Sequence, residues 1–126
     1  MSLNVVDSSG WLEYFADGKN AASFAPAIED TTQLLVPVIC IYEVFKQVLQ
    51  QRGLSAAHAA IADMHSGQVI ELDVSLAVSA AKLSAEMKLP MADSLILATA
   101  RAQGAQVWTQ DEHFNGLEGV KYIPKS

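Results

Sequence analysis

The sequence predicts an α/β fold whose sheet is mainly parallel and has about five strands. Two observations support this fold class. Short apolar runs alternate along the chain with longer segments whose apolar residues recur at helical spacing, which is the order typical of parallel strands joined by helices. The chain has 126 residues, of which 51% are hydrophobic and 17% are charged, as expected for one folded domain that spans residues 1–126.

The first predicted strand is Leu3–Asp7, because short apolar runs suit parallel strands that are buried on both faces. Apolar residues then occur at i, i+1 and i+4 in SSGWLEYFADG, which predicts a helix that ends near Gly18. Another helix is predicted over Asn20–Asp30, although its interior contains Pro26, which removes one helical hydrogen bond.

The middle of the chain repeats this order. The apolar run Gln33–Val38 predicts the second strand. From Ile41 onward, the apolar residues fall at i, i+3, i+4, i+7 and i+8, which predicts an amphipathic helix that ends at Gly53. A further helix is predicted to begin at Ser55 and to end at Gly67.

The last part of the chain contains three predicted strands and two predicted helices. Asp73 ends the third strand and suits the N-cap of a helix that runs to about Lys88. Pro90 suits the first turn of the next helix, and Gly104 suits its C-terminal cap. The three strands are Gln68–Asp73, Ala105–Thr109 and Val120–Ile123.

Composition restricts the classes of function. The net charge of −6 argues against a general electrostatic grip on nucleic acid, which needs a basic face, but carboxylates that hold divalent cations can still bind a phosphate substrate. The single cysteine, Cys40, excludes an intramolecular disulfide, and we expect its thiol to be buried and inert. No apolar run reaches the roughly 20 residues of a membrane span, and no leader pattern is evident. We therefore expect a cytoplasmic protein without a membrane segment.

The segment MADSLILATA contains a single charged residue, Asp93. Ile96, Leu97 and Ala100 lie at i+3, i+4 and i+7 from it, so its carboxylate projects from a packed helix face. An isolated buried carboxylate costs several kcal/mol. The helix N-terminus offsets only about 0.3–1 kcal/mol of this cost, and up to about 2 kcal/mol when partly buried. A divalent cation is therefore the stronger candidate partner for Asp93.

Three further acidic residues are candidates for the same site. Asp7 ends the first predicted strand and Asp111 follows the fourth, and open α/β sheets bind ligands beyond the carboxyl ends of their strands. Each also has an ordinary explanation, Asp7 as a turn residue or helix N-cap and Asp111 as a loop aspartate. Glu43 flanks the apolar face of its helix and is equally explained by a weak ion pair with Lys46. His113 could approach the site beside Asp111, but a loop role is favoured for it.

Four segments, in the same order and at similar spacing, resemble the PIN domain family, and within it the small VapC-type toxins of bacterial and archaeal toxin–antitoxin pairs. These segments are VVDSSGWLEYF, VPVICIYEVFKQ, PMADSLILATARAQGAQVWTQDEHF and LEGVKYI, which together span nearly the whole chain. The resemblance implies a three-layer α/β/α domain whose acidic pocket binds Mg²⁺ or Mn²⁺ and cleaves RNA. It also implies a homodimer that a cognate antitoxin protein neutralises.

The resemblance also implies four acidic catalytic and metal-binding residues: Asp7, Glu43, Asp93 and Asp111. We expect Glu43 to bind the metal through water or to orient the attacking water. Ser9 and Thr109 match hydroxyl residues that support the first and last acidic positions. The segment VPVICIYE departs from the Ser/Thr-rich turn that members often have before the glutamate. Lys46, one turn after Glu43, is a candidate contact to the RNA phosphate.

Two other function classes remain open. A catalytically silent PIN-like interaction module is one, although the presence of all four carboxylates argues against it. A receiver-like, Mg²⁺-binding phosphoacceptor domain is the other. That class expects an acidic pair and a late lysine that are not evident here. The sequence therefore predicts a metal-dependent endoribonuclease that acts as the toxin of a toxin–antitoxin pair.

Overall fold

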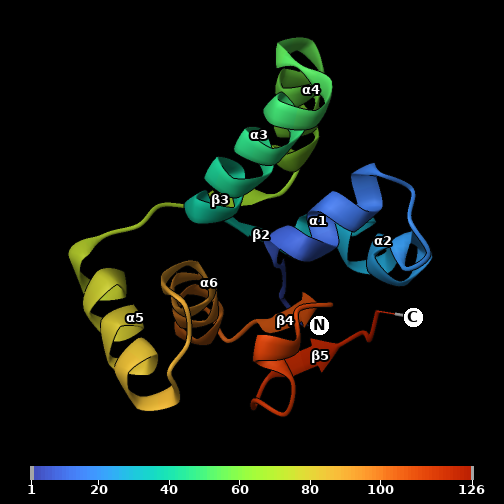
Figure 1. Ribbon diagram of the computed structural model, residues 1–126. Helices are drawn as coiled ribbons and strands as arrows, with labels where there is room; N and C mark the ends of the chain where they lie inside the picture. Colours follow the sequence, from blue (N-terminus) through green and yellow to red (C-terminus); the bar gives the residue numbers. More distant parts are fainter. Residues whose placement is uncertain (1, 126) are drawn as a thin grey trace.

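The computed structural model describes residues 2–125 and contains a five-stranded sheet in the order β3-β2-β1-β4-β5 (Figure 1). All four strand pairings are parallel. The predicted fold class is confirmed, and each predicted strand is present in a slightly shorter form. The strands are β1 (Asn4–Val6), β2 (Leu34–Pro37), β3 (Gln68–Ile70), β4 (Gln106–Thr109) and β5 (Val120–Tyr122). The predicted domain bounds, residues 1 and 126, lie outside the described range.

The helices form three pairs, α1 with α2, α3 with α4, and α5 with α6 (Figure 1). The crossovers from β1 to β2 and from β2 to β3 run in one direction across the sheet, whereas the crossover from β3 to β4 runs back. Because such crossovers are right-handed, α5 and α6 cover the face opposite the other helices, which gives three layers. The helices are α1 (Ser8–Phe15), α2 (Ala21–Glu29), α3 (Val38–Arg52), α4 (Leu54–Met64), α5 (Val74–Met87) and α6 (Met91–Ala102).

Some element boundaries differ from the predicted ones. Helix α3 begins at Val38, directly after Pro37, whereas the apolar spacing predicted a start at Ile41. Pro37, the last residue of β2, still has extended backbone angles, with φ −59° and ψ 137°. Because α3 begins at the next residue, no loop separates the strand from the helix. Two short 3₁₀ helices, η1 (Thr31–Gln33) and η2 (Glu112–Phe114), were not predicted, because single turns have no apolar periodicity.

At the third crossover, the predicted N-cap is confirmed, but the strand ends three residues before the predicted end at Asp73. Strand β3 ends at Ile70, and the next three residues are exposed. Asp73 is the N-cap of α5, and its Oδ1 accepts the backbone N–H of Leu76 at 2.8 Å. Within residues 2–125, none of the helices combines the length and the apolar character needed to cross a bilayer.

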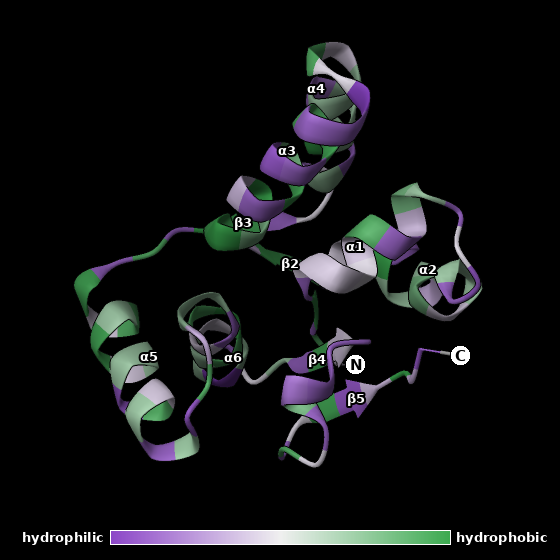
Figure 2. Ribbon diagram, viewed as in Figure 1, coloured by the Kyte–Doolittle hydropathy of each residue, from purple (hydrophilic) through white to green (hydrophobic). Residues whose placement is uncertain are grey.

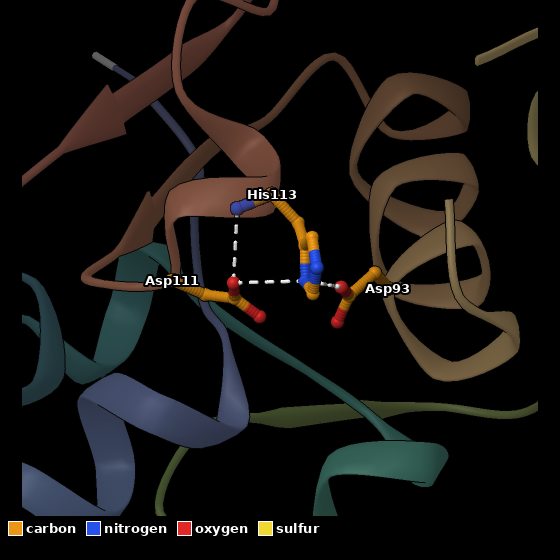
Figure 3. Close-up of side chains that lie close together, drawn as sticks. All are labelled: Asp93, Asp111 and His113. Carbon is orange, nitrogen blue, oxygen red and sulfur yellow. Dashed lines mark hydrogen bonds and ion pairs between the residues drawn. The ribbon is translucent and has the colours of Figure 1, made fainter. Parts of the chain in front are cut away.

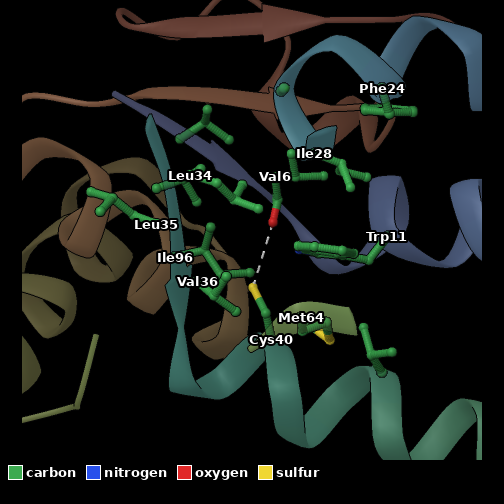
Figure 4. Packing of buried hydrophobic residues seen from close by; sticks show 14 of the residues in the cluster. Val6, Trp11, Phe24, Ile28, Leu34, Leu35, Val36, Cys40, Met64 and Ile96 are labelled. Atoms are coloured by element: carbon green, nitrogen blue, oxygen red, sulfur yellow. Dashed lines mark hydrogen bonds between the residues drawn. The ribbon is translucent and has the colours of Figure 1, made fainter. Parts of the chain in front are cut away.

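The core lies between the sheet and the helices on both of its faces (Figure 4). Strand residues Val6, Val36 and Val107 are fully buried, and β2 appears green in the hydropathy view (Figure 2). Cys40 is also fully buried, and its Sγ lies 3.8 Å from the carbonyl oxygen of Val6. Burial raises the pKa of this thiol well above its ordinary value, which agrees with the expected buried thiol.

Candidate functional site

A crevice forms where the strand order of the sheet reverses. Strand β1 lies in the middle, and the chain leaves it toward β2 and later returns to β4 on its other side. In open α/β sheets, this arrangement leaves a crevice beyond the carboxyl ends of the two diverging strands. Asp7 directly follows β1, and Asp111 lies two residues past β4. Both carboxylates therefore stand at the edge of the sheet where ligands bind.

Asp7 is a buried carboxylate held by the first turn of α1. Only 2% of the residue is exposed. Its Oδ1 accepts hydrogen bonds from the hydroxyl of Ser9 at 2.7 Å and from the backbone N–H of Gly10 at 3.1 Å. Burial raises the pKa of Asp7 to about 6, and the charge of Asp111 adds to the rise, while these hydrogen bonds oppose it. The N-cap role of Asp7 is thus observed, and it places the carboxylate in the crevice.

Asp93, in the first turn of α6, points across the crevice toward Asp111 (Figure 3). The imidazole of His113, from η2, lies between them. Its Nδ1 is 3.2 Å from Asp93 Oδ2 and 3.1 Å from Asp111 Oδ1. Each residue offers one ligand atom, and these three atoms lie within 4.8 Å of one another. This spacing is small enough for a single cation to contact all three.

The pKa of Asp93 reflects first its burial and then the negative charges around it. Burial and the charges of Asp111 and Asp7 raise it to about 7, and Glu43 also raises it. His113 opposes the rise. All four predicted acidic residues therefore act on the same region. Because Mg²⁺ and Mn²⁺ bind carboxylate oxygens, the donors present here fit a divalent cation, which would offset their repulsion.

Glu43 reaches the site from α3 and is held by a hydroxyl. The Ser8 Oγ–H donates to Glu43 Oε1 at 2.6 Å, so the hydroxyl that VPVICIYE does not provide comes from α1. Lys46 is exposed, and its Nζ lies 5.9 Å from the centroid of the Tyr42 ring. Among residues 2–125, no ion pair joins Lys46 to Glu43. The bond from Ser8 therefore orients Glu43.

A second set of hydrogen bonds ties the end of β4 to α1. Thr109 is fully buried, and its Oγ1 accepts the backbone N–H of Asp111 at 2.9 Å and lies 3.5 Å from Ser9 Oγ. The neighbouring side chain of Gln110 accepts a hydrogen bond from the Asn20 amide at 3.0 Å. These contacts fix the turn that carries Asp111 against the helix that carries Ser9.

The sequence arguments favoured a loop role for His113 over an approach to the site, and they missed the contact of Ser8. His113 lies two residues after Asp111, and the single turn of η2 brings its ring back over that carboxylate. Ser8 follows Asp7 directly, and the start of α1 aims its hydroxyl at α3. In both cases, the sequence signal was a position close to a candidate aspartate. Ser8 follows Asp7 in the segment DSS, and His113 lies two residues after Asp111 in the segment DEH.

A three-layer α/β/α domain with acidic side chains at the β1–β4 crevice defines the class of the protein. The chain belongs to the PIN domain family, whose model matches residues 5–120. The family prediction and the three-layer fold that it implies are confirmed. No curated protein sequence matches the chain significantly.

Solved structures share the fold at low sequence identity. A toxin–antitoxin complex from Klebsiella pneumoniae has 22% identity and a TM-score of 0.78, covering 95% of this chain and 99% of that one. VapC20 of Mycobacterium tuberculosis, described as a sarcin–ricin loop cleaving toxin, has 21% identity and a TM-score of 0.79, with coverage of 96% and 99%. A DNA-bound VapBC from Salmonella typhimurium has 14% identity and a TM-score of 0.75, with coverage of 98% for both chains.

Proposed function

We propose that this PIN domain, residues 1–126, is a metal-dependent endoribonuclease that acts as the toxin of a toxin–antitoxin pair. The observation that carries the proposal is the convergence of four carboxylates on the β1–β4 crevice, two of them with strongly raised pKa values. Such crowding of like charges is unfavourable without a cation. The solved structures of similar fold, one of them described as a sarcin–ricin loop cleaving toxin, support the assignment.

The proposed ligands are Asp7, Asp93 and Asp111, with Asp111 bound directly or through water and Glu43 bound through water. Mg²⁺ and Mn²⁺ both suit oxygen donors and keep several water ligands. The cation, when bound, polarises the scissile phosphate and activates water as the nucleophile. Hydrolysis forms a bond between the water oxygen and phosphorus and breaks the bond between phosphorus and the leaving ribose oxygen, which takes up a proton.

The chain's own side chains orient this chemistry. Ser8 holds Oε1 of Glu43, which leaves the other oxygen free to orient the attacking water and accept its proton. Thr109 fixes the backbone that carries Asp111, and Ser9 does the same for the carboxylate of Asp7. Since these contacts exist before substrate arrives, the carboxylates need little rearrangement during the reaction.

Two cavities beside the carboxylates are candidate paths for the RNA. One of about 370 Å³ is lined by Asp111, Tyr122 and Lys125. The other, of about 300 Å³, extends past Ser9 to Arg52 and shares Lys125. We propose that Lys125 and Arg52 contact phosphates along these cavities, and Tyr122 offers a ring for base stacking. Lys46 remains a proposed further phosphate contact on the exposed side of α3.

The proposed partners are a cognate antitoxin and a second copy of the chain, in the cytoplasm. Two of the similar structures are toxin–antitoxin complexes, one of them bound to DNA, which supports the antitoxin. The homodimer is supported by an apolar groove of about 540 Å³ between α5 and α6, lined by Leu72, Ala80 and Met91. Val74 and Val78 expose further apolar surface on α5.

The decisive test is cleavage of structured RNAs in the presence of Mn²⁺ by the native protein and by Asp7→Asn. We expect cleavage by the native protein, loss with EDTA, and at least about a hundredfold loss in Asp7→Asn, because one charged ligand of the cation is removed. Cleavage that is unaffected by Asp7→Asn, or by EDTA, would exclude a metal-dependent nuclease at this site. Stable labelling of an aspartate by acetyl phosphate would instead favour the phosphoacceptor class.

A further inference from the structure

The imidazole of His113 occupies the space between two proposed ligands (Figure 3). Its Nδ1 lies 3.2 Å from Asp93 Oδ2 and 3.1 Å from Asp111 Oδ1. Two donor atoms that are each about 2.1 Å from one ion, at right angles, are separated by about 3 Å. The two measured separations therefore match those of neighbouring ligands on one cation.

The local fold fixes His113 in this place. Asp111 caps η2, and its Oδ1 accepts the backbone N–H of His113 at 3.0 Å. The next residue, Phe114, is fully buried and anchors the turn in the core. The side chain of His113 is itself 57% exposed, so packing does not force its ring toward the carboxylates. The ring is instead held by the contacts of its Nδ1 with Asp93 and Asp111.

Imidazole changes which cations a site prefers. Oxygen-only sites suit Mg²⁺, which gives up its water ligands reluctantly. Imidazole nitrogen suits first-row transition metals, whose affinity for mixed nitrogen and oxygen sites exceeds that of the alkaline-earth ions. We propose that His113 coordinates the cation through Nδ1 together with Asp93 and Asp111, and that this nitrogen makes the site select transition-metal ions over Mg²⁺.

This inference rests on the proposed function, since it adds a ligand to the same site. It goes beyond that proposal in the choice of metal, because carboxylates alone would serve a nuclease with either Mg²⁺ or a transition-metal ion. The alternative role for His113 is an ion pair with the two carboxylates. In that case, a bound cation displaces the imidazole from the carboxylates. The two roles differ in whether nitrogen remains bonded to the metal.

The test uses the small number of histidines in the chain, which are His58, His65 and His113. His58 and His65 are exposed, on α4 and at its end, so a protein carrying His58→Gln and His65→Gln keeps one imidazole. Electron spin-echo spectroscopy of its Mn²⁺ complex, made without a histidine tag, should detect nitrogen bound to the metal. His113→Phe, which keeps a ring of similar shape, should abolish this signal.

Calorimetric titration gives the second measurement. We expect His113→Phe to weaken Mn²⁺ binding by about tenfold or more and Mg²⁺ binding much less, so that the ratio of the two affinities falls. Asp93→Asn is the control and should weaken both ions. If the variant that lacks His58 and His65 fails to fold, the single change His113→Phe in the native chain still decides whether the nitrogen signal comes from His113.

The outcomes separate the two proposals. Mn²⁺ binding that requires Asp93 but shows no bound nitrogen, with an unchanged ratio of affinities in His113→Phe, would overturn the role of His113 and leave the nuclease intact. An absence of Mn²⁺ binding by the native protein would overturn both proposals.

Discussion

At the scale of single residues, the site holds carboxylates that resist ionisation. The pKa of Asp7 is raised to about 6 and that of Asp93 to about 7, from an ordinary value of 3.8, with burial as the largest cause in both. Ionising these buried carboxylates at neutral pH therefore destabilises the metal-free protein. A cation and a proton both offset this cost, so they compete for these oxygens.

The first prediction concerns the stability of the metal-free protein as pH rises. Because the folded-state pKa values of Asp7 and Asp93 exceed 3.8, the unfolded chain releases these protons at lower pH than the folded protein does. The stabilisation by protonation is complete below about pH 4 and is lost as pH rises to about 7. Urea unfolding in EDTA should give a free energy of unfolding that is higher at pH 5 than at pH 8, by on the order of a few kcal/mol. Equal values at both pH values would contradict it.

The second prediction concerns Asp93→Asn, which removes the charge and keeps the shape. In EDTA at pH 8, this variant should be more stable than the native protein, by on the order of 1 kcal/mol or more. Mg²⁺ or Mn²⁺ should raise the melting temperature of the native protein and leave that of Asp93→Asn unchanged. Asp63→Asn, an exposed position on α4, is the matched control and should behave like the native protein. Equal metal-induced shifts in native protein and Asp93→Asn would remove Asp93 from the site.

At the scale of elements, α1 couples the packing of the core to the site. A Cβ added at Gly10 would lie 2.7 Å from Val6 Cγ1 and 2.8 Å from the Phe24 ring, so α1 needs glycine to approach β1 and α2 this closely. The backbone N–H of the same residue donates to Asp7 Oδ1. A displacement of α1 therefore also moves a proposed metal ligand.

The third prediction compares two glycine substitutions with different causes. Gly10→Ala should destabilise the protein by about 1–3 kcal/mol through overpacking, and it should also weaken Mn²⁺ binding. Gly53→Ala has open space around it but a φ of +90°, so strain alone should cost about 1–3 kcal/mol, with Mn²⁺ affinity unchanged. Urea unfolding measures the stability of the two variants, and calorimetry measures their Mn²⁺ affinity. An unchanged Mn²⁺ affinity in Gly10→Ala would contradict the proposed coupling between core packing and the site.

Sequence reasoning predicted the strands and helices but only part of the site. The predicted strands and helices follow from apolar runs, helical periodicity and capping residues, which depend on neighbours along the chain. Asp93 was found because it breaks an apolar helix face. The contact from Ser8 to Glu43 joins residues 35 positions apart, and the ring of His113 is placed by a single 3₁₀ turn. Such contacts depend on how elements pack, which periodicity does not encode.

At the scale of the whole molecule, the net charge of −6 means that the proposed RNA binding would depend on a small number of cationic side chains and on the proposed metal ion. The fourth prediction is that Lys46→Ala weakens RNA binding, measured with Ca²⁺ in place of Mg²⁺. Because one phosphate contact is lost, the slope of log affinity against log salt concentration should fall in magnitude by about 0.7. Lys82→Ala, exposed on α5, is the control and should leave the slope unchanged. An unchanged slope in Lys46→Ala would exclude this contact.

The strand order has a consequence for dividing the chain. Val5 on β1 pairs with Val107 on β4, so the first and last parts of the sequence meet at the centre of the sheet. The exposed connection Glu71–Asp73 separates a piece with Asp7 and Glu43 from a piece with Asp93 and Asp111. A protease cut there would leave each fragment with half of the carboxylates. The protein is therefore a natural candidate for fragment complementation, in which enzymatic activity reports that the two pieces have found each other.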